Sequence, residues 1–314
     1  MPYSPRRRSG RAGSGPPRTH ATDDTGEVTD ATQGMVAGKT AIVTGGASGL
    51  GEATCRLMVR EGARVVVADI QDAKGEAVAA DLGDAAIYRH VDVTSEEAIR
   101  MVVDETVERW GRLDCMFNNA GIVGSVGPID EMPLDEWQFS IDVLLKSVFL
   151  GSKHAARVMK PQGFGVILST SSVAGIQGGL GPHAYNMAKT AIVGFTKNLA
   201  AELGPFGVRA NAIAPGKHNT PMNADVLFGD PDALERSLEY FTTKATPLKG
   251  RAGLAEDIAE AATWLMSDRA GFVSGHTLVV DGGLTTGSVE GAAPGRGRFA
   301  SHEPMLREGG RRGI

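Results

Sequence analysis

The sequence has few cysteines, no long apolar run and no excess of positive charge, and each absence excludes a class of protein. Only Cys55 and Cys115 occur among 314 residues, so no disulfide framework is indicated. We expect both thiols to be reduced and buried, in a cytoplasmic protein. No apolar run approaches the ~18 residues that a membrane-spanning helix needs. The formal net charge of −5 argues against a general nucleic-acid-binding protein, and no His, Cys and acidic residues have metal-site spacing.

The two ends of the chain differ in composition from the middle. The first 34 residues hold arginines and then acids, with little apolar surface to offset the entropy of ordering. We therefore predict a disordered N-terminal extension over residues 1–37. A targeting peptide is disfavoured because no apolar region or amphipathic stripe is present, and an extended or misassigned start before Met35 is the simpler interpretation. The Gly/Arg-rich residues 285–314 are predicted to be a loose C-terminal tail.

Between these ends, over residues 38–284, short β-branched apolar runs alternate with helical patterns. This rhythm predicts βαβ units in a single α/β domain of the Rossmann type, a doubly wound parallel sheet with helices on both faces. The predicted strands are Thr40–Thr44, Arg64–Asp69, Ile87–Asp92, Leu113–Asn118, Val166–Ser169, Val208–Ile213 and Thr277–Val280. The predicted helices span about 49–61, 72–81, 95–110, 135–159, 185–203 and 255–267. The proline-containing stretch 216–250 breaks the rhythm and is predicted to form a lid over a ligand.

A glycine-rich turn follows the first predicted strand directly and leads into a helix. Its residues are Gly45, Ser48, Gly49, Leu50 and Gly51. Glycines allow the backbone to turn tightly and to approach a pyrophosphate, which would lie at the positive N-terminus of the helix. Because the turn stands between a clear strand and a clear helix, it indicates a dinucleotide site more strongly than a glycine pattern alone.

The second predicted strand ends at Asp69, 24 residues after Gly45. A carboxylate there can accept hydrogen bonds from the adenosine ribose and would repel a 2′-phosphate. Neither Ile70 nor Ser48 offers the positive charge that a 2′-phosphate requires, so NAD is favoured over NADP. Taken alone, Asp69 is equally typical of a turn at the end of a strand.

Together, the motifs resemble those of the classical short-chain dehydrogenase/reductase family. Thr44–Gly51 resembles its Thr-Gly-x-x-x-Gly-x-Gly loop, and Tyr185–Lys189 its Tyr-x-x-x-Lys motif, with Ser172 thirteen residues upstream. The resemblance spans residues 38–284 and is strongest to the secoisolariciresinol-dehydrogenase-like group. It implies further cofactor contacts at Asp92, Val93, Asn119, Ala120, Gly121, Pro215, Gly216 and Thr220. It also implies a homotetramer and, for the substrate, a cyclic or terpenoid secondary alcohol.

Tyr185 and Lys189 are one helical turn apart and therefore share a face of the predicted helix. A free tyrosine has a pKa of about 10 and is a poor base at neutral pH. We expect the Lys189 ammonium, together with a positive nicotinamide ring, to lower the pKa of Tyr185. Tyr185 would then serve as general acid/base, Ser172 would hold the substrate oxygen, and Lys189 would also hold the nicotinamide ribose.

The sequence departs from the family at Leu144, where the family usually carries an Asn that holds a water behind the catalytic lysine. Leucine cannot do this, and we hypothesise that Ser147 or a rearranged water partly replaces the Asn; slow turnover is the alternative. A lid histidine, His218, could line the pocket, but a solvent-facing position is favoured. His183 is predicted to shape the pocket mouth without a chemical role.

The substrate pocket is predicted to form from 122–129, 173–183 and 217–249. Its apolar residues are Ile122, Val123, Val126, Ile176, Leu180, Met222, Leu227 and Phe228, and the sparse charge in the first two segments suggests an apolar alcohol or ketone. The helices near 135–159 and 185–203 carry apolar residues on more than one face, which indicates self-association. Two other functions stay open: a non-catalytic NAD-binding regulator or scaffold, favoured by Leu144, and an NADPH-dependent ketone reductase, disfavoured by Asp69.

Overall fold

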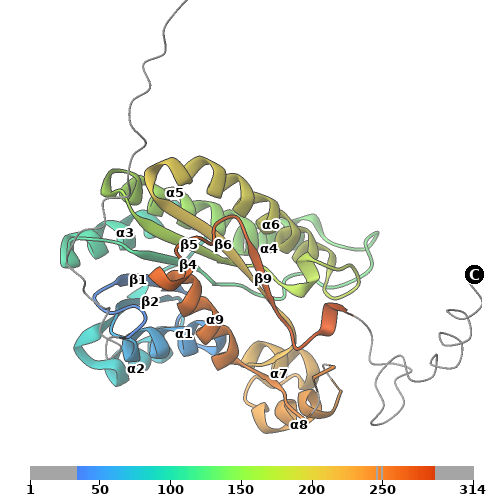
Figure 1. Ribbon diagram of the computed structural model, residues 1–314. Helices are drawn as coiled ribbons and strands as arrows, with labels where there is room; N and C mark the ends of the chain where they lie inside the picture. Colours follow the sequence, from blue (N-terminus) through green and yellow to red (C-terminus); the bar gives the residue numbers. More distant parts are fainter. Residues whose placement is uncertain (1–33, 245–246, 249, 287–314) are drawn as a thin grey trace, which may run out of the picture. The chain divides into compact units, whose positions relative to one another are not determined.

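The computed structural model describes residues 34–244, 247–248 and 250–286 (Figure 1). The predicted extension therefore lies almost wholly outside the described residues, and so does the predicted tail. The first described residues correct the predicted boundary at residue 37. Val36 is fully buried in the core, and the backbone N–H of Met35 donates to Glu61 Oε2 at 2.7 Å. At the other end, Leu284–Thr286 forms a 3₁₀ turn that is tied to Asp281 through Thr285.

A parallel sheet of seven strands forms the centre of the fold and confirms the predicted class. The strand order is β3-β2-β1-β4-β5-β6-β9, so the chain winds outward in both directions from the boundary between β1 and β4. The strands are β1 (Thr40–Thr44), β2 (Arg64–Asp69), β3 (Ala86–His90), β4 (Cys115–Asn118), β5 (Gly165–Thr170), β6 (Val208–Pro215) and β9 (Thr277–Val280). In β1, β4 and β5 every residue is buried, as expected for a sheet covered on both faces.

Helices cover both faces of the sheet (Figure 1). One core cluster joins the sheet to α1 (Gly49–Arg60), α2 (Asp72–Leu82) and α9 (Ala255–Met266). The second joins it to α3 (Glu96–Trp110), α5 (Ser147–Gln162) and α6 (His183–Leu203). Both cysteines are buried and free, Cys55 in α1 and Cys115 in β4. The two layers hold the carboxyl ends of the strands at one edge, where ligands bind in folds of this kind.

The helix predicted over 135–159 is interrupted in the structure. It consists of α4 (Leu134–Ile141), a π-helical turn at Asp142–Lys146 and α5, which continues past the predicted end to Gln162. A π turn inserts one residue into the helix and rotates the side chains that follow, and such turns are frequent at functional sites. Leu144 lies in the middle of this turn.

The segment that was predicted as a lid contains helices that the sequence analysis did not predict. It holds β7 (His218–Asn219), α7 (Pro221–Phe228) and α8 (Leu234–Lys244) and ends near β8 (Gly253–Leu254). β7 and β8 pair in parallel as a small second sheet, which ties the two ends of the segment together. The helices were missed because Pro221 and the Gly229–Pro231 turn resemble loop signals, although proline at the first position of a helix is favourable.

Candidate active site

The glycine turn between β1 and α1 has no room for larger side chains at two of its glycines. Gly45 has a φ of +67°, and a Cβ there would lie 2.9 Å from the Cα of Ala120. A Cβ on Gly51 would collide with the carbonyl oxygen of Gly45. The turn thus closes tightly on itself and on the segment that follows β4, as a backbone that approaches a phosphate requires.

A hydrogen-bond network around Thr44 and Asn119 joins the glycine turn to β4 and β5. The Thr44 hydroxyl accepts from the backbone N–H groups of Asn119 and Ala120, at 2.9 and 3.1 Å. The Asn119 side chain donates to the carbonyl oxygen of Thr44 at 3.0 Å and accepts from the Thr170 hydroxyl at 3.1 Å. Asn119 was predicted as a cofactor contact; here its side-chain atoms hold three strand ends in position.

The carboxylate of Asp69 is buried at the end of β2 and receives backbone N–H groups. Oδ2 accepts from Ala47 in the glycine turn at 3.0 Å, and Oδ1 accepts from Ile70 and Gln71 at 2.8 and 3.0 Å. Each carboxylate oxygen has about two acceptor positions, so Oδ2 keeps one for a further donor. Ile70 is 60% exposed beside it, as an apolar surface next to this acceptor.

The first turn of α1 has no side-chain cap. Ser48 occupies the N-cap position without a side-chain capping hydrogen bond, although capping serines commonly satisfy one of the first N–H groups. Thr220, which caps α7, lies across this turn: its Cβ is 3.7 Å from the position that a Cβ on Gly49 would take. The beginning of the 216–250 segment therefore covers the glycine turn.

β6 ends at Pro215, and Gly216 follows it at the edge of the sheet where β1 and β2 also end. A Cβ on Gly216 would lie 2.7 Å from Asp281 Cβ, so this position also needs glycine. Val93 is buried, whereas Asp92 is exposed and its Oδ1 accepts from the backbone N–H and hydroxyl of Thr94.

The three predicted catalytic residues meet at the carboxyl end of β5. Lys189 is buried in α6, and its ammonium donates to the carbonyl oxygen of Thr170 at 2.7 Å. Its Nζ lies 5.5 Å from the ring centre of Tyr185. The Ser171 hydroxyl donates to the backbone carbonyl of Lys189 at 2.8 Å and fixes α6 against the strand. Ser172 follows directly, and its hydroxyl accepts the backbone N–H of Ala174 at 3.1 Å.

Burial dominates the electrostatics of this group. Desolvation lowers the pKa of Lys189 to about 8, because the charged ammonium has lost water. Desolvation also raises the pKa of Tyr185 above its ordinary value, while a hydrogen bond with Ser172 acts in the opposite direction. The sequence predicted a lowered Tyr185 pKa. In the protein without cofactor the Tyr185 pKa is raised instead, because the loss of water outweighs the hydrogen bond with Ser172.

Leu144 packs close to Lys189. A Cβ on Gly121 would lie 3.4 Å from Leu144 Cδ2 and 3.8 Å from Lys189 Nζ, so the leucine and the ammonium flank the same glycine. Leu144 is fully buried. The Ser147 hydroxyl donates to the carbonyl oxygen of Val143 in its own helix at 2.5 Å. Ser147 is therefore bonded one turn back and does not supply the polar group that leucine lacks.

The two histidines that the sequence singled out occupy opposite environments. His218 was expected to face solvent, but it is 3% exposed and its Nδ1 lies 3.2 Å from the carbonyl oxygen of Gly216. Burial lowers its pKa. The ring is covered because the β7–β8 pairing brings Gly253 against it, and a Cβ there would lie 2.9 Å from the ring. His183, the first residue of α6, is exposed.

His218 also lines a cavity of about 160 Å³ where the two ends of the 216–250 segment meet the end of β9. Charged residues of both signs share it, namely Lys217, Arg251, Asp257 and Asp281. Arg251 and Asp257 pair with each other, and Asp281 accepts backbone N–H groups from Gly283 and Thr285.

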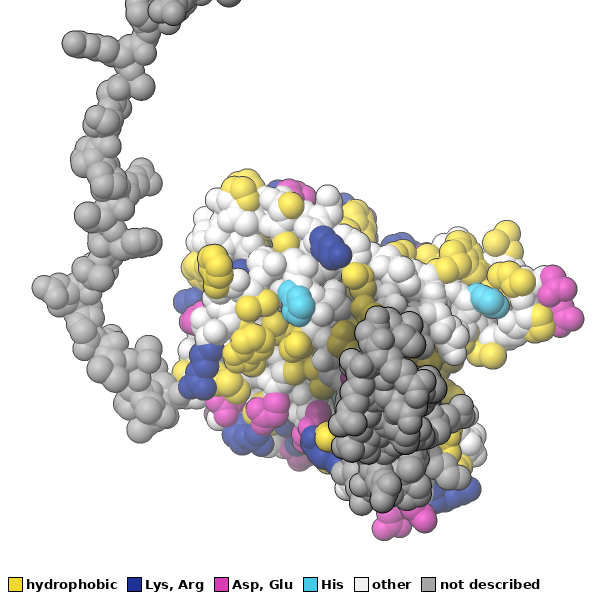
Figure 2. All heavy atoms as spheres, turned by 45° about the vertical axis from the view of Figure 1, so that its right-hand side comes forward, with side chains coloured by type: hydrophobic (Ala, Val, Ile, Leu, Met, Phe, Trp, Pro, Cys, Tyr) yellow, Lys and Arg dark blue, Asp and Glu magenta, His cyan; other side chains and the backbone are white. Residues whose placement is uncertain are grey.

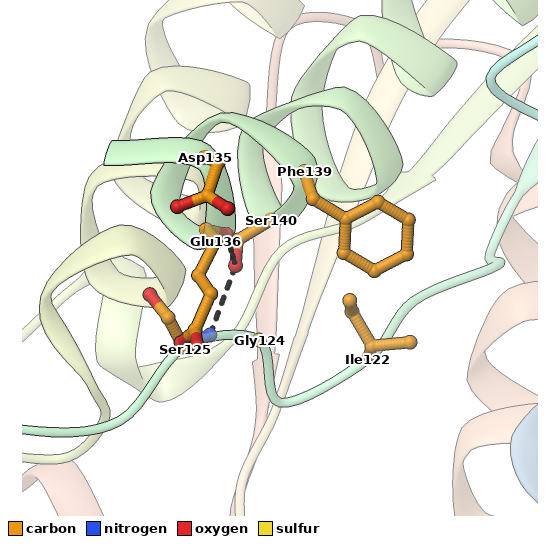
Figure 3. A pocket seen from close by; sticks show the side chains of 7 residues that line it. All are labelled: Ile122, Gly124, Ser125, Asp135, Glu136, Phe139 and Ser140. Atoms are coloured by element: carbon orange, nitrogen blue, oxygen red, sulfur yellow. Dashed lines mark hydrogen bonds between the residues drawn. The ribbon is translucent and has the colours of Figure 1, made fainter. Parts of the chain in front are cut away.

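Several residues that were predicted to line the substrate pocket are exposed. Figure 2 shows hydrophobic side chains gathered on the face that it presents. Exposed members of the predicted set are Val126, Ile176, Met222 and Leu227. Ile122 lines a cavity of about 420 Å³ together with residues of α4, an element that the prediction did not include (Figure 3).

Sequence reasoning missed two residues that hold Lys189 in position, Thr170 and Ser171. The run Thr170-Ser171-Ser172 after an apolar strand was an available signal, because polar residues at a strand's carboxyl end commonly face the ligand crevice.

Two other features are absent from the described residues. No three His, Cys, Asp or Glu side chains there are grouped to hold a metal ion. Within the same residues, no helix combines the length and hydropathy needed to cross a bilayer.

The chain is similar to characterised proteins over most of its length. A family model described as enoyl-(acyl carrier protein) reductase matches residues 45–285. Momilactone A synthase from Oryza sativa subsp. japonica is 46% identical over 251 residues, which cover 79% of this chain and 90% of that protein. Secoisolariciresinol dehydrogenase from Forsythia intermedia is 43% identical and the match covers 83% and 94%. The crystal structure of levodione reductase superposes with a TM-score of 0.73 at 34% identity, covering 80% of this chain and 99% of that one.

Proposed function

Because the chain belongs to the short-chain dehydrogenase/reductase family of oxidoreductases, we propose that it transfers a hydride between a secondary alcohol or ketone and NAD(H). The observation that carries the proposal is the cluster at the end of β5. There a buried Lys189 ammonium lies beside the Tyr185 ring, and the hydroxyl of Ser172 bonds to Tyr185. A phenol next to a buried cation is suited to exchange a proton with a substrate hydroxyl.

The carboxyl edge of the sheet fits a dinucleotide. The glycine turn brings its backbone close, and the uncapped first turn of α1 offers N–H groups to a pyrophosphate. The contacts that we assign to the cofactor are Gly45, Ser48, Gly49, Leu50, Gly51, Asp69, Ile70, Asp92, Val93, Asn119, Ala120, Gly121, Tyr185, Lys189, Pro215, Gly216 and Thr220. Bound NAD supplies the carbon that accepts or returns the hydride.

The preference for NAD over NADP rests on Asp69. The spare acceptor position on Oδ2 suits a ribose hydroxyl, and the negative charge repels a 2′-phosphate. We expect NAD to raise the melting temperature more than NADP at equal concentration, since the ligand with the lower Kd stabilises more. A larger shift with NADP would make the chain an NADPH-dependent ketone reductase.

In the mechanism, Tyr185 Oη takes the hydroxyl proton in oxidation and returns it in reduction. Ser172 holds the substrate oxygen within reach of Tyr185. Lys189, held by Thr170, stabilises the phenolate and positions the ribose. The 216–250 segment acts as the lid, which the position of Thr220 over Gly49 supports. We further propose a cytoplasmic homotetramer.

A substrate panel with Tyr185→Phe as the control tests the enzyme. Apolar and cyclic secondary alcohols should reduce NAD, and Tyr185→Phe should lower kcat by about 10²- to 10⁴-fold, the usual contribution of a general acid/base. The variant should keep NAD binding, measured by calorimetry. Unchanged turnover in Tyr185→Phe would refute the assigned role of Tyr185.

A second candidate is a non-catalytic NAD-binding regulator or scaffold, which the fully buried Leu144 beside Lys189 favours. Tight NAD binding without turnover of any alcohol or ketone in the panel would support it. Turnover that depends on Tyr185 would exclude it.

A further inference from the structure

Asn186 directly follows Tyr185 in α6, at a position that the Tyr-x-x-x-Lys motif leaves open. None of the roles assigned above uses it. Its side chain reaches the segment after β5, where Nδ2 donates to the carbonyl oxygen of Ala174. Ala174 belongs to the 3₁₀ turn Val173–Gly175, whose N-cap residue is Ser172. The contact therefore joins the helix that carries Tyr185 to the turn that carries Ser172.

The backbone of this turn holds the Ser172 side chain. The N–H of Ala174 donates to Ser172 Oγ at 3.1 Å, and the N–H of Gly175 donates to the carbonyl oxygen of Ser172 at 2.9 Å. A hydroxyl that accepts a hydrogen bond keeps its own proton to donate. The Ala174 N–H therefore fixes the position of Oγ and leaves the proton for Tyr185 or a substrate oxygen. Where the turn lies decides where the Ser172 hydroxyl lies.

Two further contacts hold the turn against α6, one helical turn away from Asn186. The Ser171 hydroxyl donates to the carbonyl oxygen of Lys189 at 2.8 Å, and a Cβ on Gly175 would lie 2.5 Å from the same oxygen. Asn186 precedes Lys189 by three residues and therefore lies on nearly the same face of the helix. With anchors one helical turn apart, the 3₁₀ turn cannot rotate about a single contact.

The acceptor of the Asn186 bond is buried next to the Tyr185 ring. Ala174 is 1% exposed, and a Cβ on Gly181 would lie 3.2 Å from Ala174 Cβ and 3.0 Å from Tyr185 Cδ1. A buried carbonyl oxygen without a donor costs free energy. We therefore expect the turn to shift toward another donor when the Asn186 amide is removed, and the Ser172 hydroxyl to shift with it.

We propose that Asn186 is a positioning residue for the reaction, because its amide holds the turn that sets the Ser172 hydroxyl against Tyr185. The inference rests on the proposed function for the roles of Ser172 and Tyr185.

Loss of the Asn186 amide has two consequences, and both pass through Ser172. The hydrogen bond with Ser172 acts to lower the pKa of Tyr185, so a displaced hydroxyl raises that pKa. A displaced hydroxyl also holds the substrate oxygen less accurately in line with Tyr185. Neither consequence requires a change in NAD binding.

Asn186→Ala tests the proposal, with Asn198→Ala as the matched control at an exposed asparagine of the same helix. Asn186→Ala should lower kcat by up to about 10²-fold, the loss that a misplacement of about 1 Å can cause. The rising limb of kcat against pH for alcohol oxidation should move to higher pH, and the Kd for NAD from calorimetry should not change. Asn198→Ala should leave kcat and its pH profile unchanged.

A double-mutant cycle with Ser172→Ala shows whether the effect passes through the hydroxyl. The Ser172→Ala protein has no hydroxyl to position, so adding Asn186→Ala should change its kcat by less than about twofold. A further fall of full size would assign Asn186 a merely structural role and overturn the proposal. If Asn186→Ala does not fold, Asn186→Ser takes its place in the cycle, because a serine hydroxyl is shorter and bonds back to its own helix.

A titration of Tyr185 separates this inference from the proposed function, because it requires no turnover. Fluorotyrosine in place of the four tyrosines reports their ionisation by fluorine NMR, and the signal that Tyr185→Phe lacks is that of Tyr185. Asn186→Ala and Ser172→Ala should both move this titration to higher pH, whereas Asn198→Ala should not. That result supports the positioning role even if no alcohol is oxidised and the proposed function fails. A wild-type titration in Asn186→Ala overturns the role while the dehydrogenase assignment stands.

Discussion

At the scale of single residues, Lys189 links chemistry to stability. Its pKa is lowered to about 8, whereas in the unfolded chain it is near 10. The folded protein therefore binds fewer protons between these two pH values, so stability rises with pH across this window. Below pH 8 the full penalty of burying the charge is present, on the order of 3 kcal/mol.

Lys189→Met should remove this penalty and its pH dependence. The free energy of unfolding of the variant relative to the wild type should fall by about 3 kcal/mol as the pH rises from 7 to above 10, because only the wild type gains stability there. Urea unfolding at several pH values measures the difference, and the lost bond to Thr170 contributes equally at every pH. A difference that does not change with pH would contradict a buried, charged lysine.

Leu144 is the second residue with a testable role, because its identity should affect the rate of turnover. If proton exchange behind Lys189 limits turnover, Leu144→Asn should raise kcat, because the amide restores a polar group next to the ammonium. The same change should lower stability by about 1–3 kcal/mol, since it buries a polar group in a fully buried position. Leu144→Met keeps the apolar volume and serves as control. An unchanged or lower kcat in Leu144→Asn would exclude a limiting relay.

Local spacing in the sequence was enough to predict that Tyr185 and Lys189 share a helix face. The environment of His218 and the direction of the Tyr185 pKa depend instead on how the whole chain packs. Tyr185 and Lys189 share a helix face by their spacing alone, and the structure keeps that relation. The burial of His218 depends on the pairing of β7 with β8, 35 residues further along the chain, which no local pattern contains. The direction of the Tyr185 pKa likewise follows from desolvation, a property of the whole packing.

At the scale of elements, the glycine turn and the end of α6 offer a paired test. Gly51→Ala should lower the free energy of unfolding by about 1–3 kcal/mol and weaken NAD binding, because its Cβ would collide with the carbonyl oxygen of Gly45. Gly204→Ala should be neutral or stabilise by up to about 1 kcal/mol. Gly204 has helical backbone angles and no atom within 4 Å of its Cβ position.

Thermal unfolding with and without NAD distinguishes these outcomes. A Gly51→Ala protein as stable as the wild type and equally stabilised by NAD would show that the turn can open without cost.

The bounds of β1, β2 and β9 were predicted correctly from the sequence. The π turn was not, because an inserted residue at Asp142–Lys146 leaves the apolar pattern of a continuous helix intact.

At the scale of the whole molecule, the carboxyl edge of one sheet gathers every part of the site. The turn after β1, Asp69 at the end of β2, the Asn119 segment after β4 and Ser172 after β5 lie far apart in the sequence. The strand order brings these segments to one edge of the sheet, in the fold that the alternating rhythm of strands and helices predicted. The cavity on α4 escaped prediction because it joins two segments whose contact the rhythm does not specify.

The last prediction concerns self-association through the outer faces of α5 and α6. Phe149 is 50% exposed, and its ring centre lies 6.5 Å from that of Phe195 on α6. By contrast, Val148 on α5 and Leu199 on α6 are buried within the chain. Exposed aromatic residues on long helices are typical of interface cores, where aromatic side chains are enriched.

We therefore expect light scattering to give about four times the chain mass of 32.8 kDa for the wild type. Phe149→Arg should produce smaller species, because it places a charge at the centre of the proposed contact. Met101→Arg, a change at a similarly exposed residue of α3, should leave the mass unchanged. A wild-type protein of single-chain mass would contradict self-association, and a Phe149→Arg protein that keeps the full mass would place the contact elsewhere.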